Sequence, residues 1–194
     1  SEAQETIMTD TVDHLSPAPL LAGKRGLIMG VANDRSIAWG IAKALHGAGA
    51  ELAFTYQGDA FKRRVEPLAG EVGAKVLLPC DVMDEASVDQ VFDSLKQGVG
   101  KIDFVIHAVA FSNKEELKGR YVDTTLENFL MTMQISCYSF TSVARRAAAM
   151  MNPGGSLLTL SYIGAERVMP NYNVMGVAKS ALEASVRYLA NDLG

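Results

Sequence analysis

Residues 25–31 read Arg-Gly-Leu-Ile-Met-Gly-Val, an apolar run that predicts a buried strand ending in a glycine turn. A helical pattern follows over residues 36–48, because Ile37, Ile41 and Leu45 recur on one face. The alternation continues, with strands predicted at 51–56, 75–79, 102–109 and 155–161 and helices at 60–72, 84–97, 126–151 and 172–193. Strands that alternate with helices in this way are typical of repeated βαβ units.

The predicted strands are nearly continuous apolar runs, which is expected when helices cover both faces of a parallel sheet. We therefore predict an α/β fold with a Rossmann-like, doubly wound parallel sheet. Pro67 is expected to kink or interrupt the helix that contains it. The sequence shows no linker or repeat, so residues 21–194 are predicted to form a single domain. Residues 1–20, polar and acidic with Pro17 and Pro19, are expected to form a flexible extension.

The composition is that of a globular protein, with 48% hydrophobic and 21% charged residues among 194. A net charge of −4 without a basic stripe speaks against nucleic acid as a partner. The basic pair Arg145-Arg146 is interpreted as a solvated helix face. No apolar run reaches the ~18 residues that a membrane span needs. Cys80 and Cys137 show no zinc spacing, which predicts free thiols in a reducing cytosol and no metal site.

The residues at the expected carboxyl ends of the strands point to a dinucleotide, since ligands of such sheets bind there. The usual G-x-G-x-x-G pattern is absent, but Gly30 allows close backbone approach and Ser36 opens the next helix with a hydroxyl. A simple glycine turn with an N-capping serine remains the alternative. Gln57 is neutral and can bond adenine or ribose. No Arg or Lys follows it immediately to pair with a 2′-phosphate, which favours NADH over NADPH. Asp81 either accepts from the adenine amino group or caps a turn.

The second feature is a pair of polar side chains seven residues apart, Tyr172 and Lys179. Seven residues make about two helical turns, so both lie on one helix face. A phenol and an ammonium there can hold a substrate oxygen and a cofactor sugar side by side, and Tyr162 lies just before the helix. The alternative is structural, with Tyr172 packing at the helix start and Lys179 solvated. His107, at the end of the fourth strand, is more typical of a core histidine than of a catalyst.

Together these residues resemble the enoyl-acyl-carrier-protein reductases of bacterial type II fatty acid synthesis, a divergent branch of the short-chain dehydrogenases/reductases. The resemblance runs from about Leu21 to Gly194. It is carried by residues 30–32 with 36–38 and Gly40, residues 51–57, 80–82 and 157–162, and residues 170–176 with Ala178 and Lys179. The main branch of the superfamily places lysine four residues after the tyrosine. Here Gly176 has that place, as in the enoyl reductases.

The resemblance implies that NADH delivers hydride to the β-carbon of a trans-2-enoyl thioester, the last reductive step of fatty acid elongation. Tyr172 would stabilise the enolate oxygen, Lys179 would hold the nicotinamide ribose, and Tyr162 would be a second tyrosine of the active site. Ser112 matches a substrate-side position. The remaining matches are cofactor contacts: Gly30, Ser36, Ile37, Gln57, Asp81, Val82 and Val109. The family also implies acyl carrier protein as partner, a homotetramer and a cytoplasmic location.

Two departures from the family pattern stand out. Ala108-Val109-Ala110 replaces the Ser-Ile-Gly of many members. The family pattern also continues past the position of Gly194, so the resemblance implies a chain that is incomplete at its C-terminus. Two other functions stay open from the sequence. One is another short-chain dehydrogenase/reductase acting on a ketone or alcohol, and the other is an inactive nucleotide-binding fragment.

Overall fold

The computed structural model describes residues 19–194. Within that range the strands are β1 (Arg25–Met29), β2 (Glu51–Tyr56), β3 (Val76–Pro79), β4 (Ile102–His107) and β5 (Met151–Thr159). The helices are α1 (Ile37–Gly47), α2 (Gly58–Glu71), α3 (Glu85–Gly98), α4 (Leu126–Met133), α5 (Ser139–Ala148) and α6 (Asn173–Leu193). The flexible extension was expected over residues 1–20. Residues 1–18 of it lie outside the described part of the chain.

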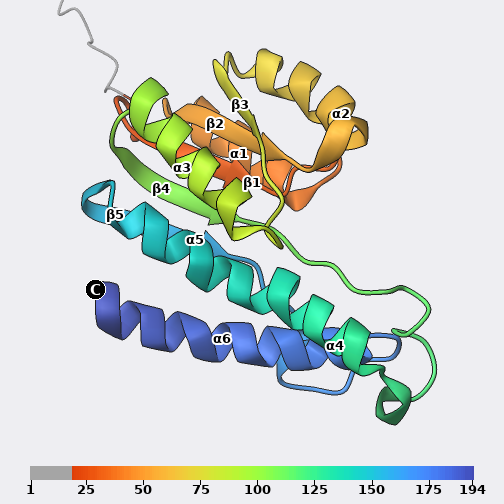
Figure 1. The fold of residues 1–194 in the computed structure, drawn as a ribbon. Coiled ribbons are helices and arrows are strands. Elements are labelled where there is room, and N and C mark those ends of the chain that lie inside the picture. The colour runs from red at the N-terminus through yellow and green to blue at the C-terminus, as the bar shows by residue number, and fades with distance from the viewer. Residues whose placement is uncertain (1–18) are drawn as a thin grey trace, which may run out of the picture.

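The strands form one parallel sheet in the order β3-β2-β1-β4-β5 (Figure 1). This order confirms the predicted α/β, Rossmann-like fold. Because the chain crosses between β3 and β4 from one outer strand to the far side of β1, the carboxyl ends of β1 and β4 meet at a topological switch point.

Helices cover both faces of the sheet, and the strand residues alternate between two apolar clusters. Leu27 of β1 packs in a cluster with α3 and α5, whereas Ile28 packs in a second cluster with α1 and α2. Both side chains are fully buried. A strand whose successive residues are all apolar therefore serves two hydrophobic layers, as the sequence predicted.

Pro67 does not interrupt its helix, since α2 runs on from Gly58 to Glu71. A proline inside a helix removes the bond to the carbonyl four residues earlier, here that of Arg63. Arg63 is exposed, so water can satisfy that carbonyl and the helix continues. The predicted interruption of the helix at Pro67 is therefore wrong, and the predicted kink stays a prediction.

The helix predicted over residues 126–151 is divided into three parts. A π-helical turn, η2 (Gln134–Tyr138), separates α4 from α5, and β5 begins already at Met151. Ser139 Oγ donates to the carbonyl of Ile135 at 2.6 Å, so a side chain competes for helix hydrogen bonding within this stretch. Such turns are common at functional sites, and η2 lies beside the cleft described next.

Candidate active site

A cleft of about 390 Å³ opens at the carboxyl ends of the strands. Its lining comes from residues 29–32, residues 55–57, Cys80, Val82 and Met83, residues 108–111, and Phe61, Met131 and Ile135. The volume is within the usual range for small-molecule sites, about 300–1,000 Å³. Of the predicted cofactor contacts, Gly30, Gln57, Val82 and Val109 line it. Ser36, Ile37, Asp81 and Lys179 are not among the lining residues.

Gly30 lies where β1 leaves the sheet, and no other residue fits there. Its φ of +101° is a conformation that side chains rarely adopt, and an added Cβ would come within 1.9 Å of the carbonyl oxygen of Ala108. The turn therefore passes tightly against the end of β4. Glycine is thus required here by the end of β4, whereas the close approach to a ligand at Gly30 stays a prediction.

The hydroxyl of Ser36 organises the turn that follows. It accepts from the amides of Ala32 and Asn33, both at 3.2 Å, and donates to the carbonyl of Asn33. It does not cap the helix, and in the described chain no side chain accepts from the first amides of α1. Ile37 begins α1 and is 69% exposed. The amide of Trp39 donates to the Ser36 carbonyl, whereas the amides of Ile37 and Ala38 are available to an anion such as a pyrophosphate.

Asp81 follows β3 and shapes the loop that leads into α3. Its Oδ1 accepts from the amide of Met83 at 2.9 Å, and its own amide donates to Ser87 Oγ at 2.9 Å. Asp84 then caps α3 by accepting from Ala86 N, as the sequence predicted. Asp81 thus makes the turn contact foreseen as one of its two roles.

Tyr172 forms the start of α6 and packs on Tyr162, with ring centroids 4.9 Å apart. Two glycines make room for it. A Cβ on Gly164 would come within 2.4 Å of the Tyr172 ring, and a Cβ on Gly176 would come within 2.8 Å of the Gly164 carbonyl oxygen. Burial and the neighbouring Tyr162 raise the pKa of Tyr172. Its phenol is therefore neutral near pH 7 and able to donate a hydrogen bond.

Lys179 is only 7% exposed, so the alternative of a solvated lysine is wrong. Its Nζ donates to the carbonyl of Leu160 at 2.8 Å, and burial lowers its pKa. Because Tyr172 packs on Tyr162 and Lys179 bonds Leu160, the N-cap residue of α6 and a lysine within that helix contact the same short segment after β5. The structure thus brings together the three residues that the sequence singled out.

Ser112 lies inside the protein. It is buried, and its hydroxyl is 2.8 Å from Thr132 Oγ1 and 3.2 Å from Asn128 Nδ2, so helix α4 holds it. His107 is fully buried, with Nδ1 3.0 Å from Thr159 Oγ1 and Nε2 2.8 Å from Ser139 Oγ. It is the core histidine that the sequence favoured.

Sequence reasoning missed several apolar residues of the cleft, among them Phe61, Phe111 and Ile135. Isolated apolar residues on helix faces and loops look like core residues, so no sequence signal marks them. Ser136 was missed as well. Its Oγ accepts from the amide of Phe111 at 3.0 Å and lies 3.1 Å from the carbonyl of the same residue, which fixes the loop after β4.

The fold and this cleft define a Rossmann-like dinucleotide-binding domain. The family model described as enoyl-(acyl carrier protein) reductase matches residues 30–194. The chain therefore belongs to the enoyl-(acyl carrier protein) reductase family.

Two relatives illustrate the similarity. Enoyl-[acyl-carrier-protein] reductase [NADH] 1 of Rhizobium meliloti is 69% identical over 175 residues, which are 90% of this chain and 64% of that protein. The corresponding reductase of Rickettsia typhi is 55% identical, with 90% of this chain and 67% of that protein covered. The chain thus spans about two thirds of the length of these relatives.

A solved structure agrees with them. The enoyl-(acyl-carrier-protein) reductase of Anaplasma phagocytophilum, in complex with NAD, superposes with a TM-score of 0.88 at 63% identity, covering 90% of this chain and 67% of that one. In addition, none of the helices within residues 19–194 combines the length and apolar character that crossing a bilayer requires.

Proposed function

We propose that this chain provides the cofactor-binding and catalytic domain of an NADH-dependent enoyl-acyl-carrier-protein reductase, with residues 21–194 as a single domain. The substrate is a trans-2-enoyl thioester on acyl carrier protein, and the reaction is the last reductive step of fatty acid elongation. The observation that carries the proposal is the convergence of Tyr162, Tyr172 and Lys179 on one segment after β5. The names and NAD complex of the relatives support it.

The residues present fit a dinucleotide. The cleft is mainly apolar, Gly30 removes the side chain that would block close approach, and the uncapped start of α1 suits a pyrophosphate. Gln57, at the end of β2, offers an amide to the adenosine without requiring a 2′-phosphate, which supports NADH over NADPH. When bound, NADH supplies the hydride for the β-carbon of the substrate.

Tyr172 donates its phenol proton to a hydrogen bond with the thioester oxygen. Negative charge develops on that oxygen as the enolate forms, and a donor placed there stabilises it. The raised pKa of Tyr172 keeps this proton on the phenol at neutral pH. Tyr162 supports the Tyr172 ring by contact and is itself 46% exposed.

Lys179 holds the hydroxyls of the nicotinamide ribose, and its charge favours the enolate nearby. Its hydrogen bond to Leu160 O fixes one of its three donors and leaves two for the cofactor. Ser112 borders the substrate side. Since its hydroxyl is already bonded to Thr132 and Asn128, any contact with substrate is through its main chain.

We further propose a cytoplasmic homotetramer that acts on acyl carrier protein. The exposed apolar side chains of α4 and η2 support an interface between copies, since Leu126, Leu130 and Tyr138 all face outward there.

The deciding experiment follows the loss of NADH absorbance with a crotonyl or longer enoyl thioester. A β-ketoacyl thioester serves as the control substrate, and calorimetry measures NADH binding in parallel. We expect reduction of the enoyl substrate alone. Activity on the β-ketoacyl substrate but not the enoyl one would point to the ketone-reducing branch. Absence of NADH binding would point to an inactive fragment.

A further inference from the structure

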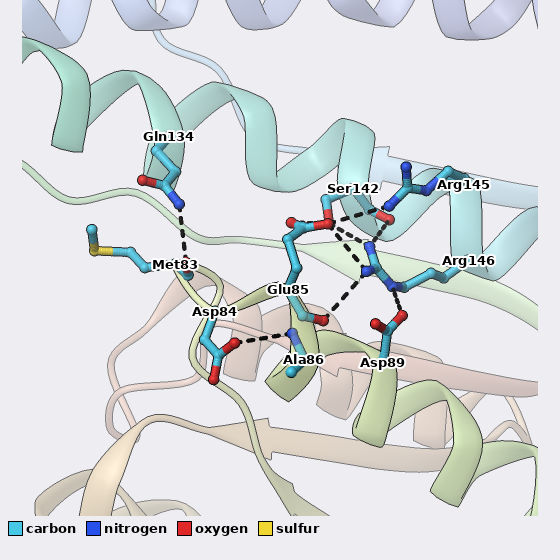
Figure 2. Close-up of polar contacts among 9 residues, drawn as sticks. All are labelled: Met83, Asp84, Glu85, Ala86, Asp89, Gln134, Ser142, Arg145 and Arg146. Atoms are coloured by element: carbon cyan, nitrogen blue, oxygen red, sulfur yellow. Dashed lines mark hydrogen bonds and ion pairs between the residues drawn. The ribbon is translucent and has the colours of Figure 1, made fainter.

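Two walls of the cleft come from segments far apart in the chain. One wall is the loop between β3 and α3, residues 80–84, which contributes Cys80, Val82 and Met83. The other contains Met131 and Ile135 from α4 and η2. Gln134, next to Ile135, reaches across and donates from Nε2 to the carbonyl of Met83 at 3.0 Å (Figure 2). The spacing of the walls is therefore held by a direct hydrogen bond.

A second tie lies at the start of α3 and is built around Arg146 of α5, as Figure 2 shows. Its Nε donates to Asp89 at 2.7 Å, and its Nη2 donates to the Glu85 carboxylate at 3.1 Å and the Glu85 carbonyl at 3.3 Å. Its Nη1 donates to Ser142 Oγ at 2.6 Å. We call these four residues, Glu85, Asp89, Ser142 and Arg146, the Arg146 brace.

The interpretation of Arg145-Arg146 as a solvated face is wrong for Arg146. Its side chain is 10% exposed, against 65% for Arg145. Isolated surface ion pairs stabilise a protein by about 0–1 kcal/mol, but networks of fixed geometry are the exception. In the brace every nitrogen of the Arg146 guanidinium has an acceptor, and Ser142 also donates to Glu85 at 2.8 Å. These hydrogen bonds therefore fix the orientation of the Arg146 guanidinium in addition to pairing its charge.

The brace adds polar contacts at the start of α3, beside apolar packing that already includes Val88 of α3 and Val82 of the loop. Farther along α3, Val91 and Leu95 share an apolar cluster with Val143 and Ala147 of α5, and these contacts secure the body of the helix. Arg146 of the brace bonds to Glu85, which is the first residue of α3 and follows directly after the loop. Its contact with the Glu85 carbonyl restrains the main chain itself.

We propose that the Arg146 brace and Gln134 are positioning elements that fix the loop of residues 80–84, and with it the cleft wall for the adenosine half of the dinucleotide. The inference rests on the proposed function, because it assigns a role in cofactor binding to residues that do not touch the cofactor. No chemical step depends on the brace or on Gln134. These residues therefore affect the affinity for the dinucleotide and leave the positions of Tyr172 and Lys179 unchanged.

The test compares Arg146→Met with the wild-type chain by hydrogen exchange and by binding of ADP-ribose and NADH. We expect faster amide exchange at residues 82–84 without any ligand. We also expect about fivefold weaker binding of both ligands, which corresponds to about 1 kcal/mol. In steady-state assays the KM for NADH should rise by the same factor while kcat is unchanged. Gln134→Ala should reproduce the effect in weaker form.

Two variants serve as controls. Arg187→Met removes an exposed arginine of α6 that makes no hydrogen bond or ion pair within the described residues, so it should leave exchange and affinity at wild-type values. Arg145 is unsuitable as a control because it also donates to the Glu85 carboxylate, at 3.2 Å. Val143→Ala lowers stability through the core of the same helix pair without touching the brace, so it should lower the melting temperature and spare ADP-ribose affinity.

The outcomes separate this proposal from the function it rests on. Wild-type binding of ADP-ribose with an unchanged Arg146→Met affinity would overturn the positioning role. Equal losses in Val143→Ala and Arg146→Met would also overturn it, since general destabilisation would then explain both. If the wild type binds neither ligand, the proposed function fails, and unchanged exchange at residues 82–84 in Arg146→Met would still refute the brace.

Discussion

The rings of Tyr162 and Tyr172 pack with centroids 4.9 Å apart and planes inclined at 59°. One tyrosine follows the last strand and the other begins the last helix, so this contact joins the sheet edge to α6. The inclined arrangement is a favourable one for aromatic pairs. It holds the Tyr172 phenol without using its hydroxyl, which stays free for a substrate oxygen.

Tyr172→Phe should therefore affect turnover far more than binding. The ring contact survives, but the donor to the developing oxyanion is lost, and such donors are worth about 100-fold or more in kcat. We expect a fall of that size with an unchanged KM for NADH, measured by NADH oxidation with an enoyl thioester. Tyr188→Phe, at a residue of the same helix that is 76% exposed, is the matched control. A Tyr172→Phe enzyme with wild-type kcat would remove Tyr172 from the mechanism.

Lys179→Met should weaken NADH binding by about tenfold or more, because hydrogen bonds from a charged group are worth about 1.5–3 kcal/mol. Methionine keeps the apolar stem packed, so the melting temperature should change less than the affinity. Calorimetric titration with NADH measures the effect. Lys96→Met, at an exposed position near the end of α3, controls for loss of a positive charge. NADH affinity within error of wild type would refute the role assigned to Lys179.

Gly176→Ala should destabilise the chain although alanine is the better helix former. Alanine gains about 1 kcal/mol in helix propensity, but overpacking costs about 1–3 kcal/mol, and here the new Cβ meets a main-chain oxygen at 2.8 Å. We expect a net loss of about 1 kcal/mol in urea unfolding. Gly40→Ala lies within α1 with nothing within 4 Å of the added Cβ, so it should be stabilising. Equal shifts in the two variants would contradict the contact with Gly164.

Stability should fall on acidification because of His107. Burial lowers its pKa from 6.5 to about 4, so between these values the unfolded chain binds a proton that the folded chain does not. The stability present above pH 6.5 is therefore lost as pH falls toward 4, by roughly 3 kcal/mol from this group. The free energy of unfolding in urea, measured for wild type and His107→Gln between pH 6.5 and 4, isolates the contribution of His107.

A direct titration provides the second measurement for His107. The ring resonances of His107 in the wild-type protein should titrate with a midpoint near 4. A histidine with its ordinary pKa would titrate near 6.5. A midpoint near 6.5, or parallel pH dependences for wild type and His107→Gln, would show that burial does not keep this ring neutral.

Much of the fold was predictable because each strand contains a short, largely apolar run and the connecting segments have a helical period. The cap at Asp84 followed from its side chain and position alone. The break between α4 and α5 was not predicted. Beside it Ser139 bonds both to Ile135 and to His107, which lies 32 residues away and is brought there only by the fold. The continuity of α2 through Pro67 was not predicted either, because it requires that the carbonyl of Arg63 lies on the side of the helix that faces water.

The candidate site divides in the same way. The seven-residue spacing of Tyr172 and Lys179 predicted a shared helix face. In the structure Lys179 lies within α6, but Tyr172 is the N-cap before it and Asn173 has a φ of +39°, so both residues reach the segment after β5 without a continuous helix between them. The sequence did not predict that the carbonyl of Gly164 leaves no room for a side chain at residue 176. It also did not predict that Arg146 bonds to Glu85 and Asp89. These contacts join segments that only the completed fold brings together.

The central place of β1 also affects how the chain folds during its synthesis. Arg25 donates its amide to Asp103, 78 residues later, and β1 pairs with β4 along the same edge. At about 5–20 residues per second, a ribosome needs about 4–16 s to make the intervening chain. For that time one edge of an apolar strand has no partner. Pairing with β2 covers only the opposite edge of β1, so the edge that β4 will occupy stays open until residues 102–107 have been made.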